Sequence, residues 1–497
     1  MAETNSTELS YTRQTGFKEP LPANPNWRLL EFSEISSFGN SFGKAEPTRI
    51  SRNRNPRKKR TVSADSGLEF TAPLDQGSIR DFGEGFCFGQ AVGAPAFAVS
   101  DVTATGYTVA AVGASASASL INGQTILMAR GFENDANNGE RILAGAVGNG
   151  DTEIPAPDTA VEVVAANRRG ELHVAGVRGA AGDLQIDADG NLISTALDFT
   201  TLRLAVGQAI FIGGTDEVNN FDQEVNRGFA RVKVIEANKL TLEKRDYIYV
   251  ADAGAGAEID ILFGEFIRNY DREHANFLRA YYLFSLKTIF ETPAKTTYEF
   301  AHNNVCDSLS FNLGDEFVDL TMGFVGTITD NPVETLADGQ VNAAPLNATQ
   351  EFTTATDLVR ISVDNLDEEG LLTDFDSLTL TISNEASRRK VLSSLEASQI
   401  NIGDFVVTFD FTAIFTNSDV IEAIRCDKEL SLRFPMWNDD GGLYIHLPRV
   451  GLEGGDRSFP ENESVTIGGT GYAYDEDAAG ACFELSTFPL LPTRPCA

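Results

Sequence analysis

The chain contains few of the residue types that build reactive sites. Its 497 residues include four histidines, five cysteines, four methionines and two tryptophans. The histidines stand singly, and no two cysteines have the close spacing of a metal site. Catalysis and metal binding need several such side chains together, and the common nucleophile, zinc and phosphate-binding motifs are missing from the sequence. We therefore predict no enzyme activity and no catalytic, cofactor or metal site.

Long hydrophobic segments are missing too. No run of apolar residues reaches the roughly 18 that a membrane-spanning helix requires, so we expect no membrane span. The first residues lack the charged and apolar regions of a signal peptide, which favours folding in a cytoplasm. In that reducing compartment, the odd number of cysteines predicts free and mostly buried thiols.

Basic residues are scarce relative to acidic ones, with 39 Lys and Arg against 72 Asp and Glu and a net charge of −33. Ordinary nucleic-acid binding requires a basic surface, so this balance argues against it. Strong acidity keeps a protein soluble and repels other polyanions. It is compatible with a surface past which nucleic acid slides without binding.

One segment departs from this acidity. Residues 49–60 contain no acid and seven basic side chains: Arg49, Arg52, Arg54, Arg57, Lys58, Lys59 and Arg60. Three interpretations fit them: a DNA contact or localisation signal, a solvated loop, or a loop that docks on the acidic surface of the next copy. We favour docking, because complementary charge steers assembly and fixes register.

The clearest structural pattern lies at residues 298–326. Apolar and polar residues alternate over 308–313 and again over 318–324, on either side of a Gly-Asp-Glu turn. A period of two predicts a pair of antiparallel strands with one apolar and one polar face. A sheet with one wet face suits a wall between a protein core and a water-filled space.

Two segments share the order strand, short loop and capped helix. Glu69-Phe70-Thr71 precedes Ser78, and Asp410-Phe411-Thr412 precedes Asn417 and Ser418. Ser78 and either Asn417 or Ser418 are the expected helix caps. Alternating strands follow in both parts of the chain, which suggests two similar β-rich lobes.

Residues 98–262 differ in composition and contain a weak internal repeat. The segment around Gly123-Gln124 is echoed around Gly207-Gln208, and each is followed by an apolar strand, a glycine and an Asn-Asn pair. Such an echo predicts an inserted all-β module, built as two small barrels or sandwiches. Elsewhere we expect a short helix at 387–395 and an irregular tail at 485–495.

These features resemble the tail tube proteins of long, non-contractile tailed phages. The resemblance covers residues 28–90 and 277–497. It rests on the Arg-rich loop after Arg49, the strand, loop and helix at 67–88, and most specifically on the stretch from Thr297 through Leu313 to Met322-Gly-Phe-Val-Gly326. This chain has His302 where members of that family often have glycine.

The resemblance implies a mainly β fold with two tail-tube-type β-sandwich or barrel lobes, each with a flanking helix, plus the inserted all-β module. The expected domains are an N-terminal arm with the first part of lobe 1 (1–97), the insertion (98–262), the remainder of lobe 1 (263–340) and lobe 2 (341–497).

The implied function is that of a structural virion protein, made in the host cytoplasm. Its copies would form stacked rings, the tail tube, through which genome DNA passes into the host, with other tail proteins at the tube ends. The apparent duplication favours a trimeric ring with pseudo-sixfold symmetry over a hexamer. The alternative is a β-rich adhesion or receptor-binding protein of the virion. A glycan-active enzyme would need a close carboxylate pair in a cleft, and the sequence singles out none.

If the polar faces of the sheets line the channel, the lining side chains are Glu69, Ser310, Asn312, Asp319, Thr321 and Asp410. A neutral or acidic lining repels phosphates and prevents the counterion release that drives DNA binding. The alternative is that these residues face solvent on an ordinary sheet.

Overall fold

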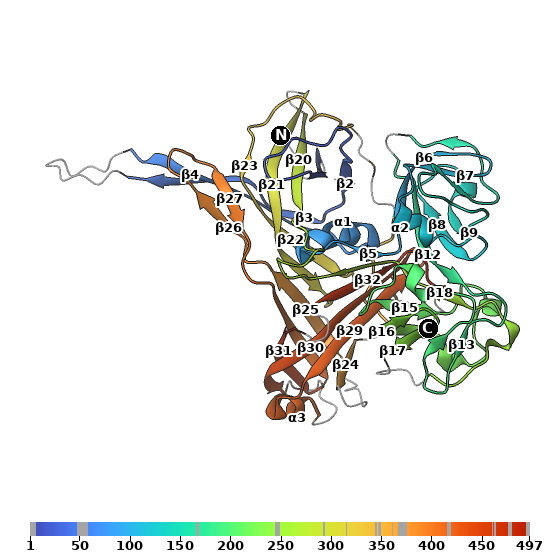
Figure 1. Cartoon of the computed structure of the whole chain (residues 1–497). Helices are drawn as coiled ribbons and strands as arrows, with labels where there is room; N and C mark the ends of the chain where they lie inside the picture. The colour runs from blue at the N-terminus through green and yellow to red at the C-terminus, as the bar shows by residue number, and fades with distance from the viewer. Residues whose placement is uncertain are drawn as a thin grey trace.

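The computed structural model describes residues 6–46, 58–165, 168–243, 249–291, 294–314, 316–342, 345, 349–359, 361–365, 375–414, 419–459, 461, 464–475 and 480–493. It confirms the predicted mainly β fold, with large antiparallel sheets in a body and in a second unit beside it (Figure 1). Among the described residues, no helix has the length and hydrophobicity needed to span a bilayer.

Eight strands of the body form one continuous antiparallel sheet, which we call the polar sheet. Adjacent strands pair in the order β3–β4–β22–β21–β25–β28–β31–β30. The predicted pairing within 298–326 is confirmed, with Asn312 opposite Asp319. The bounds are β3 Glu34–Ala45, β4 Arg60–Pro73, β21 Ala294–Asn312, β22 Asp319–Gly326, β25 Phe375–Ser383, β28 Val406–Ile414, β30 Gly441–Ser458 and β31 Thr466–Ala473.

The two longest strands, β21 and β30, leave this sheet and continue into a second layer. The first part of β21 pairs with β20 and its later part with β22; the first part of β30 pairs with β29 and its later part with β31. The strands of the second layer are β1 Thr7–Gln14, β2 Arg28–Leu30, β5 Val92–Gly93, β19 Glu265–Arg268, β20 Tyr281–Glu291, β23 Ile328–Thr329, β24 Ser362–Asn365, β29 Leu430–Asn438 and β32 Glu484–Phe488.

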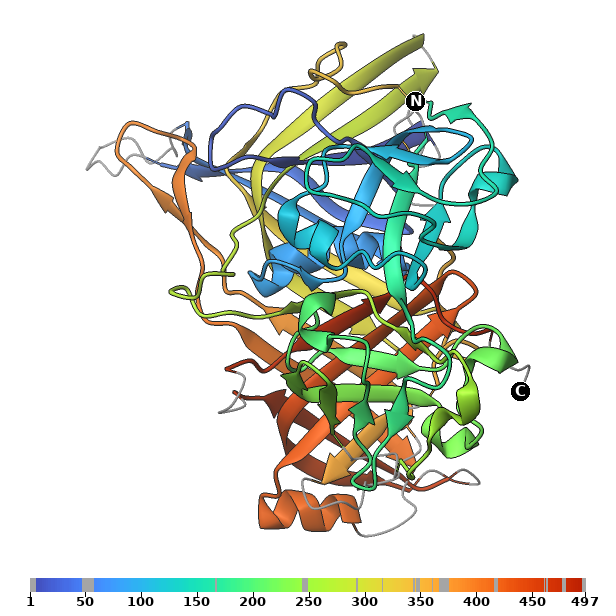
Figure 2. The same ribbon diagram turned by 45° about the vertical axis from the view of Figure 1, so that its right-hand side comes forward.

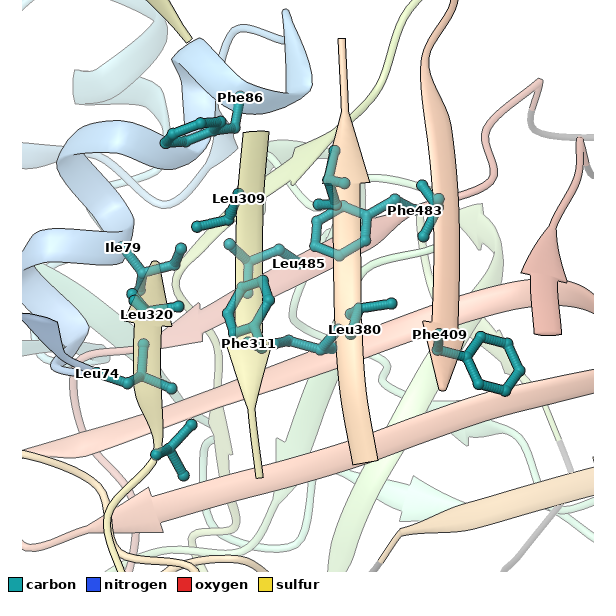
Figure 3. Close-up of a cluster of buried hydrophobic side chains, with 14 of the residues drawn as sticks. Leu74, Ile79, Phe86, Leu309, Phe311, Leu320, Leu380, Phe409, Phe483 and Leu485 are labelled. Carbon is teal, nitrogen blue, oxygen red and sulfur yellow. The ribbon is translucent and has the colours of Figure 1, made fainter. Parts of the chain in front are cut away.

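The main hydrophobic core lies between these layers and under helix α1 (Gln76–Cys87). Alternate side chains of β4, β22, β25 and β28 point into it. Figure 3 shows Leu309 of β21 beside Phe86 of α1, and Leu320 of β22 beside Ile79 of α1. The alternation of apolar and polar residues in the sequence thus identifies which face of these strands is buried in the core.

The start of α1 corrects one expectation. The N-cap is Asp75, whose Oδ1 accepts a hydrogen bond from the Ser78 backbone N–H at 2.9 Å, and Ser78 lies inside the helix. Since β4 runs to Pro73, the helix begins almost at once, and Asp75 is the first residue with a suitable acceptor. The expected caps of helix α3 (Asp419–Cys426), Asn417 and Ser418, lie outside the described residues.

A second hydrophobic core belongs to the unit formed by residues 94–263. The two sequence echoes occupy matching places there: Gly123 and Gly207 have φ of 75° and 95°, and each precedes a buried strand. The strands are β6 Ala96–Val102, β7 Gly106–Val109, β8 Thr125–Arg130, β9 Gly139–Ile142, β10 Glu153–Pro155, β11 Glu162–Val163, β12 Glu171–Arg178, β13 Gln185–Ile186, β14 Leu192–Ile193, β15 Ala209–Ile212, β16 Gly228–Glu236, β17 Lys239–Leu242 and β18 Asp260–Leu262. The short helices are α2 Ala114–Ala118, η2 Asp135–Asn137, η3 Phe199–Leu202, η4 Glu217–Asn219, η5 Glu224–Asn226 and η6 Gly254–Gly256.

Figure 2 shows the inserted unit against the body. Aromatic rings from both form part of the contact. Phe229 of β16 lies 5.3 Å from both Trp437 of β29 and Phe488 of β32, measured between ring centroids, and 5.4 Å from Tyr444 of β30. A buried aromatic cluster of this kind is typical of a fixed interface rather than a hinge.

Two further expectations were wrong. Residues 387–395 do not form a helix but a hairpin of β26 (Ser387–Lys390) and β27 (Ala397–Asn401), because its side chains bind the neighbouring strand β4. The tail expected at 485–495 begins as the buried strand β32, between β30 and β19, and becomes irregular only from Pro489.

Candidate assembly surfaces

The six residues predicted to line a channel all lie on strands of the polar sheet. Each alternates with buried core residues, so they share the face opposite the core. Strand register places three of them in one row across the sheet, since Asp319 pairs with Asn312, Asn312 with Thr379, and Thr379 with Asp410. The row continues through Thr470 to Glu453.

A neighbouring row consists of hydroxyl side chains. The Oγ1 atoms of Thr71 and Thr321 are 3.1 Å apart, and the Ser310 Oγ is 3.1 Å from Thr381 Oγ1. These hydrogen bonds satisfy the hydroxyl groups within the sheet and leave few of them to hold a ligand. Glu69 is exposed in the next row, opposite Gly323. Apart from Glu34, which pairs with Thr71 at the β3 end, the hydroxyl row is uncharged, and acids lie in the rows on both sides of it.

The polar sheet has two open edges. Within the described part of the chain, no strand pairs with the outer edge of β3, or with β30 beyond Val450 on the side away from β31. Exposed edges are usually protected by charge or by shortness. β3 is 12 residues long and carries no charge from Ile35 to Gly43. It has the properties of an edge made to pair with another strand.

Three residues of the basic cluster lie in the described part of the chain. Lys58 and Lys59 are exposed just before β4, and Arg60 is the exposed first residue of that strand. Arg49, Arg52, Arg54 and Arg57 lie outside the described residues. Lys58, Lys59 and Arg60 stand at the end of the β3–β4 hairpin, which projects from the body (Figure 1). We call residues 42–46 and 58–63 the arm.

Sequence reasoning did not find the buried ion pairs between the inserted unit and the body. Arg231 of β16 binds Glu484 of β32 through two nitrogens, at 2.9 and 2.8 Å, and His446 Nδ1 lies 2.8 Å from the same carboxylate. Burial opposes ionisation of Glu484, but the charge of Arg231 and the hydrogen bond from His446 outweigh it and lower the pKa of Glu484 to about 2.

A second ionic cluster joins α1 to β12. Arg169 binds Asp81 at 3.0 Å and Glu171 at 2.6 Å, and Arg80 contacts both Glu171 and Glu265. Burial raises the pKa of Asp81, but the nearby guanidinium of Arg169 holds it below its usual value. The partners come from segments far apart in the chain, so neither spacing nor composition could have revealed them.

The ionic clusters are structural contacts between the inserted unit and the body. Asp81, Glu171 and Glu484 each contact a guanidinium. Among the described residues, no group of three or more His, Cys, Asp and Glu side chains is placed to hold a metal ion. The buried charges fix the inserted unit to the body.

Comparison with protein families gives one match. The model of a family described as phage tail tube protein matches residues 4–475, which is nearly the whole chain. A search of curated proteins finds no match.

Proposed function

Since the chain belongs to the phage tail tube protein family, we propose that it is a structural virion protein whose copies pair edge to edge into trimeric rings. The rings stack into the tail tube, and genome DNA passes through the channel. The observation that carries this proposal is the repeated strand order of the polar sheet.

That order divides the polar sheet into two equivalent halves. The first half is β3–β4–β22–β21 and the second is β25–β28–β31–β30. In each half, the first two strands pair with each other, a shorter strand follows, and the long strand that crosses into the second layer comes last. α1 follows β4, and α3 follows β28. Both helices end in a cysteine followed by a residue with positive φ, Phe88 at 48° and Asp427 at 50°. We assign these halves to the two lobes and residues 98–262 to a decoration.

The strand pairing between the two halves of one chain suggests how neighbouring copies pair. Inside the chain, β21 of the first half pairs with β25 of the second. The same contact between copies would join β30 of one chain to β3 of the next, which are the two open edges. Transferring the register of β21 and β25 pairs Glu453 with Ser41, Gly454 with Asn40 and Asp456 with Gly39 of the next copy. Such heterologous contacts close into a ring when the rotation permits.

The number of strands favours three copies. Three polar sheets of eight strands give a barrel of 24 strands. At a spacing of about 4.8 Å, its backbone circle is at least about 37 Å across, and it widens as the strands tilt. That channel is wide enough for a DNA duplex. A ring of six such chains would have twice the circumference, which is more than a single DNA duplex requires.

The face of the polar sheet opposite the core lines this channel in our proposal. Its described strand residues in the two rows are mainly hydroxyl and acidic side chains, among them Asp319 and Asp410. DNA binding is driven by release of counterions when cationic side chains neutralise phosphates. A neutral and acidic wall provides no such gain, so DNA can move along the tube without being held.

Paired cysteines test the ring. In a background with Cys426→Ser and Cys496→Ser, the double variant Ser41→Cys/Glu453→Cys should form disulfides between chains under mild oxidation, because opposite residues of antiparallel strands lie within bonding reach. Ser308→Cys/Ser383→Cys, the equivalent pair inside the chain, is the positive control. Ser37→Cys/Glu453→Cys is the control out of register.

The covalent products measure the ring size. A trimeric ring gives dimers and trimers and no larger species in a denaturing gel, whereas a hexamer continues to six chains. Absence of linked chains from tubes seen by electron microscopy would contradict the proposed junction. For the channel, Asp319→Lys/Asp410→Lys tubes should retain duplex DNA at low salt and release it at high salt, which wild-type tubes should not do.

A further inference from the structure

The arm at the end of the β3–β4 hairpin exposes large apolar side chains to solvent. Phe42 is 57% exposed and Val62 is 53% exposed. Lys44, Lys58 and Lys59 are exposed beside them. An apolar surface edged with basic residues is typical of a contact site for another macromolecule.

The second half of the chain contains an equivalent connection that is already docked. The β26–β27 hairpin joins β25 to β28 as the arm region joins β3 to β4, and it too is basic, with Arg388, Arg389 and Lys390. Lys390 Nζ binds Asp65 Oδ1 of β4 at 2.6 Å, and Arg388 donates to the carbonyl oxygens of Gly326 and Ser66.

Apolar packing completes this internal contact. Ile400, at the end of β27, is buried together with Val305 of β21 and Val325 of β22, and Tyr281 packs against the same cluster. The hairpin thus covers the outer end of the first half of the polar sheet (Figure 1). The β26–β27 hairpin is therefore held on the first half by basic side chains and by apolar contacts together.

Among the residues that the structure describes, none covers the equivalent surface on the second half. Aligning β4 with β28 and β22 with β31 by strand register gives the equivalent positions in the two halves. Val406 corresponds to Asp65, and Tyr472 corresponds to Val325. Extending the alignment to β20 and β29 matches Glu429 with Tyr281. Val406 is 38% exposed and Tyr472 is 40% exposed, on a face that is otherwise polar. Glu429 is exposed.

The acids near this surface fit a basic partner. Asp427 and Glu429 follow the end of α3 and are exposed. Leu430 and Ala473 both pair with Val450, so Glu429 and Tyr474, their chain neighbours, lie on the two strands that flank β30. Burial raises the pKa of Tyr474, and the charges of Glu429 and Asp427 raise it further while that of Arg449 opposes them. Tyr474 in turn lies 6.1 Å from Tyr472 between ring centroids. Apolar and acidic groups therefore lie side by side, complementary to the arm.

We propose that the arm of one copy docks on the outer end of β28 and β31 of the next copy in the ring, over Val406 and Tyr472, with its lysines facing Asp427 and Glu429. This contact rests on the proposed ring and adds to it a second site for each junction. Phe42 and Val62 supply the apolar part, and charge complementarity fixes the direction of docking.

The chain carries a probe for this contact. Cys426 is exposed at the end of α3, next to Asp427, while Cys87, Cys306 and Cys482 are buried. In assembled tubes of Lys59→Cys with Cys496→Ser, a short bismaleimide should join the introduced thiol of one chain to Cys426 of the next and give dimers and trimers. Adding Cys426→Ser removes the acceptor thiol and should abolish the products. Val161→Cys, at an exposed position of the inserted unit, should give none.

The results separate this contact from the ring itself. If the Ser41→Cys/Glu453→Cys disulfide forms but the arm does not react with Cys426, the docking site is wrong and the ring stands. If neither link forms in tubes, the ring junction is wrong. Products larger than a trimer would mean that the arm reaches another ring, which also overturns the docking site.

A charge exchange gives an independent measurement. Lys58→Glu/Lys59→Glu should slow assembly about tenfold at low salt, and so should Asp427→Lys/Glu429→Lys, because rim charges act mainly on association. The combined variant should recover most of the lost rate. Unchanged circular dichroism and thermal unfolding of each unassembled variant exclude misfolding. Failure of the combined variant to recover, with both parents impaired, would contradict the pairing.

Discussion

On β22 the core-facing positions hold Met322 and Phe324, whereas the equivalent positions of β31 hold Gly469 and Gly471. The missing volume is supplied by the neighbouring strand. A Cβ atom added to Gly471 would lie 2.1 Å from the ring of Phe409, and one added to Gly469 would lie 2.8 Å from the ring of Phe411. The two halves thus share a strand order but fill their cores from different strands.

The helices differ in the same way. α1 has 12 residues and contributes Ile79, Phe82 and Phe86, whereas α3 has eight and contributes Val420 and Ala423. The first half is packed by a network of aromatic rings that includes Phe82, Phe284 and Phe324. The second half has a smaller set of contacts among Phe375, Phe409 and Phe411. Backbone pairing is constrained by hydrogen bonding, while the core requires only that its volume be filled. For this reason the sequence similarity between the halves is short although their pairing agrees.

The largest effect should come from the aromatic network of the first half. Phe324→Ala removes a ring 4.8 Å from that of Phe284 and in contact with those of Phe70 and Phe82. The expected loss in the free energy of unfolding is about 3–5 kcal/mol, from lost transfer energy and the cavity left behind. Urea unfolding of the unassembled chain measures it. Phe459→Ala, at a side chain that is 71% exposed, is the control and should change little.

The insertion, which follows α1 in the chain, is fixed to β32 of the second layer through Glu484. Glu484→Gln removes the more deeply buried of the two carboxylates that bind Arg231, leaves Glu243 as the other, and should cost about 3 kcal/mol at pH 7. Because the pKa of Glu484 is about 2 when folded and about 4.3 when unfolded, this stability is present above pH 4.3 and is lost as the pH falls toward 2.

The variant should therefore lose part of the acid sensitivity of the wild type. Urea unfolding at pH 7 and at pH 3 should show a smaller difference between wild type and Glu484→Gln at the lower pH. An equal difference at both pH values would contradict the assigned ionisation. Glu243→Gln, whose carboxylate also binds Arg231 but is more exposed, is the matched control and should lose less.

Gly471→Ala tests whether the Phe409 ring occupies the space above Gly471 of β31. Overpacking against Phe409 should destabilise the protein by about 1–3 kcal/mol. In a Phe409→Ala background, the same change should cost much less or stabilise, because the ring that it meets is absent. A double-mutant cycle on unfolding free energies measures this coupling, and additive effects would argue against the contact.

The smallest effect is expected at the start of α1. Asp75→Ala removes the acceptor for the Ser78 backbone N–H and for Thr349 Oγ1 and should cost about 1 kcal/mol. Ser78→Ala keeps that backbone N–H and should cost less. Thermal unfolding of the two variants decides between Asp75 and Ser78 as the cap, and a larger loss in Ser78→Ala would favour the serine.

The sequence predicted those elements whose signal is local. Alternation over 308–313 and 318–324 identified the β21–β22 pair and its dry face, because side chains of a strand point to opposite sides in turn. The same reasoning placed Glu69, Asp319 and Asp410 on one kind of face. It failed at 387–395, where residues suited to a helix form a hairpin held by contacts with β4. It also failed at β32, which neighbouring strands order despite the prolines that follow.

By itself, the sequence determined the acidity of the chain, its class of fold and the two faces of its strands. The tertiary structure alone decided that β21 pairs with β25, that Arg231 meets Glu484, and that β3 and β30 remain open edges within the described part of the chain. A period of two specifies which face of a strand is buried but carries no information about its neighbour. Partners distant in the chain are chosen by the packing of the whole molecule.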